Sequence, residues 1–233
     1  MPYRRLPKTD ASRLKALKTL LDNDSLYTVN GRFIDWKTMN AAQPAYNQLK
    51  TAVNQYALQL QVQTRRAPYV EKPQRKAMMY VGHFIQVLLM AVERGEIRKP
   101  QLKLYGLEET ATALPANLKS VEGLLDWGPK IIEGEKKRLL QGGRAIYNPT
   151  IGMVSTHFDI FNEAYEQQLR LKQQTQMALE KVQELRPKVD EIILELWNQI
   201  EAHFQNEPPE VRFEQCRKCG VIYYYRRNEE HLY

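Results

Sequence analysis

Apolar residues recur at intervals of three and four over most of the chain, which is the spacing of one face of an amphipathic helix. In the first such stretch Leu14, Leu17 and Leu20 follow the capping oxygens of Thr9 and Asp10. A later stretch, 77–92, is apolar around most of its circumference, so we expect that helix to be central. The pattern predicts helices over 10–22, 36–67, 73–94, 120–140, 150–186 and 187–204.

Prolines and a change of residue type predict where these helices stop. Pro68 and Pro73 predict a turn between the second and third helices, and Pro187 predicts a break between the last two. Pro44 is expected either in a first helical turn or at a kink. The segments 100–107 and 211–227 are richer in alternating, β-branched and aromatic residues, which favours extended structure.

The two halves of the chain resemble each other at a nearly constant offset. Residues 58–67 match 169–178 at an offset of 111, and 80–87 match 193–200 at 113. Shorter matches join 31–34 to 143–146 and 105–107 to 219–221. These four matches follow one another in the same order at nearly the same offset, which predicts an internal duplication, although a shared helical composition is the alternative explanation.

The duplication leads to a specific fold prediction. We expect an all-α protein whose two repeats, 1–112 and 113–233, each form a helical hairpin that is too one-sided to fold alone. The hairpins would pair about a pseudo-twofold axis into a four-helix core flanked by short helices, giving one shared core and a single structural domain. The segments 102–107 and 220–225 would then form a small β-ribbon near the C-terminus.

Composition is typical of a globular protein and excludes disordered, collagen-like and disulfide-rich classes. The formal charge of +7 is uneven, because residues 1–112 hold 18 basic and 9 acidic residues while 113–233 hold 16 and 18. An electrostatic partner is therefore expected on the first half, although drift of a solvated surface explains the difference equally well. Two cysteines, no secretory leader and no apolar run of membrane-spanning length predict a cytoplasmic protein without membrane contact.

The strongest local motif is Cys216-Arg217-Lys218-Cys219-Gly220, a CxxCG sequence that we expect at a turn between two strands. Such a turn can direct two sulfurs at one zinc ion, but it supplies only half of a tetrahedral site. His203 and His231 are the nitrogen ligands available nearby. The alternatives are a redox pair and two cysteines with no special role.

Several basic clusters suggest a nucleic acid or another acidic partner. The clearest includes Arg65, Arg66, Arg75 and Lys76, whose cations could contact phosphates. Ordinary helix surfaces carry similar pairs, and no nucleic-acid-binding signature accompanies them. Phosphate-loop, nucleophile-elbow and zinc-protease motifs are missing from the sequence, which disfavours an enzyme.

Segments 3–10, 82–87, 147–150, 195–201 and 220–223 together resemble a family of uncharacterised helical proteins from the Bacteroides group. The resemblance covers nearly the whole chain and implies a helical intracellular protein, without implying an activity. It also implies Tyr-Gly-Val at the start of the tail. Cys219 departs from that pattern, which weighs against zinc.

We therefore expect a non-enzymatic helical-bundle protein that acts through contacts with a protein partner or with its own copies. The alternative is a zinc- or nucleic-acid-binding module that uses the cysteine motif and the basic first half.

Overall fold

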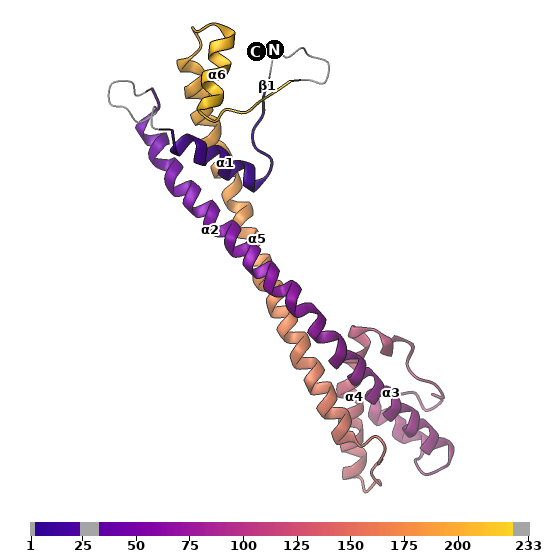
Figure 1. Ribbon diagram of the computed structural model, residues 1–233. Helices are drawn as coiled ribbons and strands as arrows, with labels where there is room; N and C mark the ends of the chain where they lie inside the picture. Colours follow the sequence, from indigo (N-terminus) through magenta and orange to yellow (C-terminus); the bar gives the residue numbers. More distant parts are fainter. Residues whose placement is uncertain (1–2, 24–32, 226–233) are drawn as a thin grey trace. The chain divides into compact units, whose positions relative to one another are not determined.

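The computed structural model describes residues 3–23 and 33–225 (Figure 1), and they are mostly helical, as predicted. The described residues form six α-helices, three 3-10 helices and one two-stranded antiparallel sheet. In chain order the elements are β1 (Tyr3–Arg4), α1 (Asp10–Leu21), α2 (Trp36–Arg66), η2 (Ala67–Val70), α3 (Glu71–Glu93), η3 (Lys99–Tyr105), η4 (Ala116–Lys119), α4 (Val121–Leu140), α5 (Ile151–His203), α6 (Pro209–Lys218) and β2 (Tyr223–Tyr224).

Both predicted proline breaks are wrong. Pro187 lies inside α5, which is continuous for 53 residues. Between α2 and α3 the backbone at Arg66, Val70 and Glu71 keeps right-handed helical angles, so a 3-10 segment replaces the predicted turn. A proline inside a helix costs about 3 kcal/mol. On either side of Pro187, α5 buries apolar residues such as Val182 and Val189, and this burial offsets the cost.

Pro44 also lies inside a helix, beyond the first turn of α2. The predicted hairpins are therefore replaced by two long helical stretches, one over 36–93 and one over 151–203.

The contacts divide the chain into two compact units. Unit 1 consists of Met1–Leu60 and Gln174–Tyr233, and unit 2 consists of Gln61–Gln173. Neither unit coincides with a predicted repeat, because unit 1 combines the start of the first repeat with the end of the second. The buried apolar residues likewise form one cluster in each unit, where the sequence predicted a single shared core.

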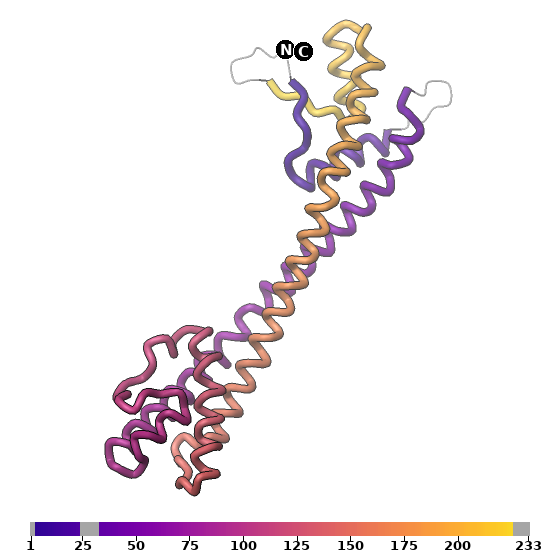
Figure 2. Tube along the Cα trace, turned by 180° about the vertical axis from the view of Figure 1, so that it is seen from behind, coloured from indigo at the N-terminus to yellow at the C-terminus, as the bar shows by residue number. Residues whose placement is uncertain are grey.

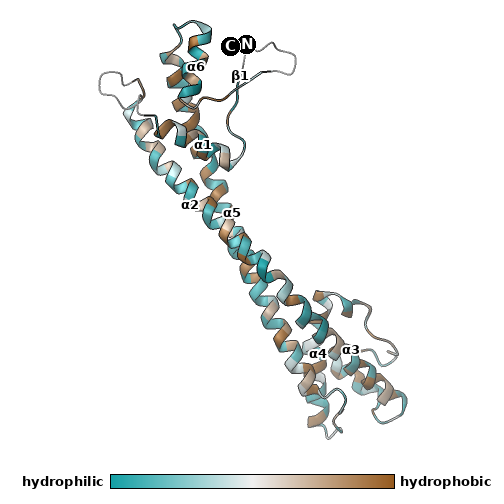
Figure 3. Ribbon diagram, viewed as in Figure 1, coloured by the Kyte–Doolittle hydropathy of each residue, from teal (hydrophilic) through white to brown (hydrophobic). Residues whose placement is uncertain are grey.

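The core of unit 1 is formed by α1, the first part of α2, the last part of α5 and α6. Leu17 of α1, Leu49 of α2 and Trp197 of α5 are fully buried there. The helices are amphipathic, since hydrophobic and hydrophilic residues alternate along each of them (Figure 3).

The small sheet also belongs to unit 1; the strand predicted in 220–225 is present, but the partner strand predicted for it is wrong. β1 pairs with β2, so that Tyr3 lies opposite Tyr224. The other proposed strand, 102–107, contributes to the 3-10 helix η3 and its C-terminal cap. Leu102 and Tyr105 are both buried at a spacing of three, which is the period of a 3-10 helix.

The core of unit 2 is formed by α3, η3, η4, α4 and the first part of α5. Figures 1 and 2 show α4 alongside the beginning of α5. α4 and η3 pack closely because Gly134 has no side chain: a Cβ there would lie 2.7 Å from the carbonyl oxygen of Leu104 and 2.8 Å from the Cα of Tyr105.

Candidate functional site

The sequence predicted that the two cysteines lie on a turn between strands, and this prediction is wrong. Cys216 lies in the last turns of α6, and Cys219 is the residue that caps this helix. Both are unpaired and buried in the core of unit 1. Burial raises the pKa of both thiols, which favours the protonated form. A protonated thiol is a poor nucleophile and a poor metal ligand.

The predicted nitrogen ligands are not brought to this pair by anything that the structure describes. The His203 ring stacks on Phe33 with centroids 3.9 Å apart and meets Phe204 edge-on. His231 lies outside the described residues. Within 3–23 and 33–225, no group of three or more His, Cys, Asp or Glu residues is placed to hold a metal ion. Zinc binding stays a prediction.

The four predicted cations, Arg65, Arg66, Arg75 and Lys76, are all exposed and all belong to unit 2; we call them the basic group. Two of them have local partners: Arg75 forms an ion pair with Glu71 at 3.0 Å, and Arg66 lies 5.8 Å from the centre of the Tyr69 ring. Such exposed pairs contribute little to stability and are available for exchange with a ligand. Binding of a nucleic acid here stays a prediction.

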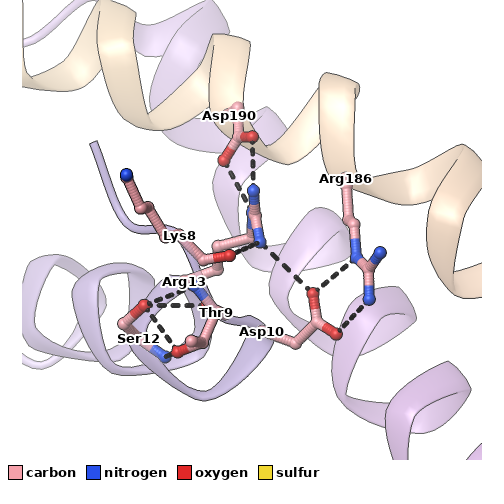
Figure 4. A network of polar contacts seen from close by, with 7 residues as sticks. All are labelled: Lys8, Thr9, Asp10, Ser12, Arg13, Arg186 and Asp190. Atoms are coloured by element: carbon pink, nitrogen blue, oxygen red, sulfur yellow. Dashed lines mark hydrogen bonds and ion pairs between the residues drawn. The ribbon is translucent and has the colours of Figure 1, made fainter.

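A polar network that the sequence analysis missed joins α1 to α5 in unit 1 (Figure 4). Arg186 donates two hydrogen bonds of 2.8 Å to Asp10, and Arg13 donates two of 2.8 Å to Asp190. The bonds from Arg186 hold the pKa of Asp10 below its ordinary value of 3.8. Thr9 and Ser12 cap α1 reciprocally beside the network. Because every carboxylate here faces a guanidinium, the arrangement fastens one helix to another.

A second missed network is buried in unit 2. The Nε of Arg138 donates to the Tyr105 hydroxyl at 2.8 Å, and its Nη2 donates to a Glu135 carboxylate oxygen at 2.7 Å. The Tyr105 hydroxyl donates a hydrogen bond to the other Glu135 oxygen, and burial raises the pKa of Tyr105. Arg138 also reaches the Arg144 carbonyl at 2.6 Å, and the Ile146 N–H donates to Glu135 at 3.5 Å. These partners are supplied by the protein itself, so the network is structural.

A groove of about 1190 Å³ lies in unit 2. One wall is the C-terminal part of α3, where Gln86, Leu89, Met90 and Glu93 lie on one face. The other wall is the non-helical segment 109–115, which leads into η4. We call this hollow the α3 groove.

The apolar lining of the α3 groove is open to solvent. Met90 is 53% exposed and Leu114 on the opposite wall is 36% exposed. The sequence contained a signal for this surface, because the apolar residues of 77–92 cover more of the helix than one core can bury. The expectation that this helix is central holds for its buried residues, such as Phe84 and Leu88, whereas Met79 and Met90 lie outside the core.

A smaller hollow of about 430 Å³ lies in unit 1 between α2 and α5. Its lining is mainly amide and hydroxyl side chains, namely those of Asn47, Gln48, Thr51 and Gln55, with Lys181 opposite. It has no exposed large apolar residue, so the α3 groove is the stronger candidate for a binding site.

In the described part of the chain, no helix combines the length and the hydropathy that a membrane span requires. Comparison of the whole chain with protein-family models, with curated proteins and with solved structures gave no match.

Proposed function

We propose that this helical protein is non-enzymatic and acts through protein contacts, and that the α3 groove is where it binds a partner. The observation that carries the proposal is that two exposed apolar side chains, Met90 of α3 and Leu114 of the segment 109–115, line the same groove.

The groove has properties that suit a polypeptide. Its volume of about 1190 Å³ exceeds the range of roughly 300–1,000 Å³ that is typical of small-molecule sites. Its lining alternates small residues, such as Ala111 and Ala113, with threonines, which allows close approach of another main chain. Met90 adds an unbranched, polarisable side chain that adapts to different partners.

A selection from a random peptide library tests the proposal. The purified full chain is the bait, and Met90→Glu is the counter-selection bait because a charge at this position disrupts apolar contact. We expect enriched peptides that bind the wild type and lose at least tenfold in affinity for Met90→Glu.

The matched control is Met79→Glu, because Met79 is exposed on the same helix but does not line the groove. It should leave peptide affinity within twofold of the wild type. The proposal would be overturned if circular dichroism shows both variants folded and no peptide is enriched that binds the wild type in preference to Met90→Glu.

We also infer that the chain arose by internal duplication, as the sequence matches indicated. Two helix ends support this inference, because they share one pattern at an offset of 114. The Leu107 N–H donates to the Leu102 carbonyl at 3.2 Å, and the Val221 N–H donates to the Cys216 carbonyl at 3.0 Å. Each bond closes around a glycine in the left-handed conformation, with φ of 74° at one and 89° at the other.

The same offset relates the buried positions around these caps. Leu102, Tyr105 and Leu107 are buried after α3, and Cys216, Cys219 and Val221 are buried at the equivalent positions after α5. The two unit boundaries, after Leu60 and after Gln173, are 113 residues apart. In this comparison the cysteines occupy places that apolar side chains fill in the first repeat, which favours a packing role for them. A pseudo-twofold arrangement of the repeats stays a prediction.

A further inference from the structure

We propose that the α3 groove takes an extended, acidic segment of a partner protein, whose main chain forms hydrogen bonds with residues 112–114. This inference rests on the proposed function and goes further by naming the conformation and the charge of the ligand.

The conformation follows from the non-helical wall of the groove. In the part of the chain that the structure describes, the main-chain N–H and C=O groups of Thr112, Ala113 and Leu114 have no hydrogen-bond partner. These residues are exposed and lie in a segment without helical backbone. An extended ligand can satisfy such groups as an added strand does at a sheet edge, whereas a helix has already used its own.

The charge follows from the four charged residues that line the groove. Glu109 is neutralised by Lys103, whose Nζ lies 2.7 Å from its carboxylate. Lys99 and Lys119 have no ion-pair partner among residues 3–23 and 33–225, and Glu93 is the acidic residue left unpaired there. The charges of the four lining residues cancel, but with Glu109 neutralised by Lys103 two lysines face one glutamate, and this excess of one positive charge complements Asp and Glu side chains in the ligand.

The apolar side chains set a further requirement. Alternate side chains of an extended chain point to opposite faces, so residues at positions i and i+2 of the ligand face the groove together. Met90 and Leu114 offer them an apolar surface. We therefore expect alternating apolar residues flanked by carboxylates in the bound segment.

The test uses the peptides enriched by the wild-type bait. We expect them to contain excess Asp and Glu, and to bind about tenfold more weakly when the protein carries K99E and K119E together. Replacing the acidic residues of the peptide by Lys should restore binding to this doubly substituted protein. Methylation of single peptide nitrogens should weaken binding about tenfold at alternate positions only.

The outcomes separate this inference from the proposed function. Enriched peptides with no acidic preference, or with binding that tolerates methylation at every nitrogen, would overturn the extended acidic ligand and leave the groove as a peptide site. If no peptide is enriched that binds the wild type in preference to Met90→Glu, the proposed function and the extended acidic ligand are both overturned.

Discussion

The buried network of unit 2 gives the sharpest prediction about stability. Arg138→Met keeps an unbranched side chain as far as the position of Nε but removes the cation that faces Glu135 at 2.7 Å. The side chains of Arg138 and Glu135 are only 3% and 1% exposed, so the carboxylate left behind cannot be hydrated. Removing one member of a buried ion pair costs about 3–5 kcal/mol.

This loss is expected mainly in unit 2, so the assay must report on each unit separately. Hydrogen exchange measured by mass spectrometry does so, because peptides from 121–140 report on α4 and peptides from 181–200 report on unit 1. A loss of 3–5 kcal/mol corresponds to roughly 150- to 5000-fold faster exchange where exchange follows the opening equilibrium. The peptides of unit 1 are the internal control and should change little.

A second variant tests the reason for the effect. Glu135→Leu combined with Arg138→Met removes both charges and replaces them with apolar groups, which often costs little at buried pairs. The double variant should therefore recover most of the lost protection. The reasoning would be refuted if Arg138→Met accelerated exchange in α4 less than tenfold, or if the double variant were no better than the single one.

Three further predictions concern the other polar features. Because Arg186 lowers the pKa of Asp10 below 3.8, the stabilisation by this ion pair is complete above pH 3.8 and is lost as the pH falls through the lowered pKa. In Asp10→Asn, hydrogen exchange from α1 should therefore be faster at pH 6 and depend less on acid. An unchanged acid dependence would contradict this. If Cys216 is a packing residue, Cys216→Val should lower the free energy of unfolding in urea by less than about 1.5 kcal/mol, and Cys216→Ser should lower it by more. Equal losses in both variants, together with stabilisation of the wild type by added zinc, would favour a metal site. Changing the whole basic group to glutamine should leave the affinity for groove-binding peptides within twofold of the wild type. The rival nucleic-acid function would be supported if the wild type binds single-stranded DNA, if salt weakens this binding, and if the variant does not bind.

Helix positions were predictable because their signals are local. The helix expected over 120–140 is observed as Val121–Leu140, and its start is marked by Ser120, whose hydroxyl accepts the N–H of Gly123. The helix expected over 10–22 is observed as Asp10–Leu21, with the capping residues that the sequence suggested. Each of these ends depends on residues within one turn, so the sequence alone contains the information.

The failures have a different origin. Proline has a known local cost, but whether a helix continues through it depends on apolar contacts made far away in sequence, as at Pro187. Partners such as Arg13 and Asp190 are 177 residues apart, and no local pattern pairs them. Of the candidate site, the exposed Met90 could have been suspected from the excess of apolar residues in 77–92. The opposing wall, which is a loop of small residues, has no comparable signal.

The position of the α3 groove in the chain has a consequence for function. Its non-helical wall, 109–115, lies where the first repeat ends and the second begins, and a segment that joins two copies occurs only once in a duplicated chain. Under the proposed duplication, we therefore expect no counterpart of this wall among the described residues of unit 1, where the equivalent cap leads into β2 instead. Lys99 lies in the half of the chain that holds the excess of basic residues, whereas Lys119 lies in the other half. Under the proposed duplication and the proposed function, one such groove would let each chain bind a single partner segment.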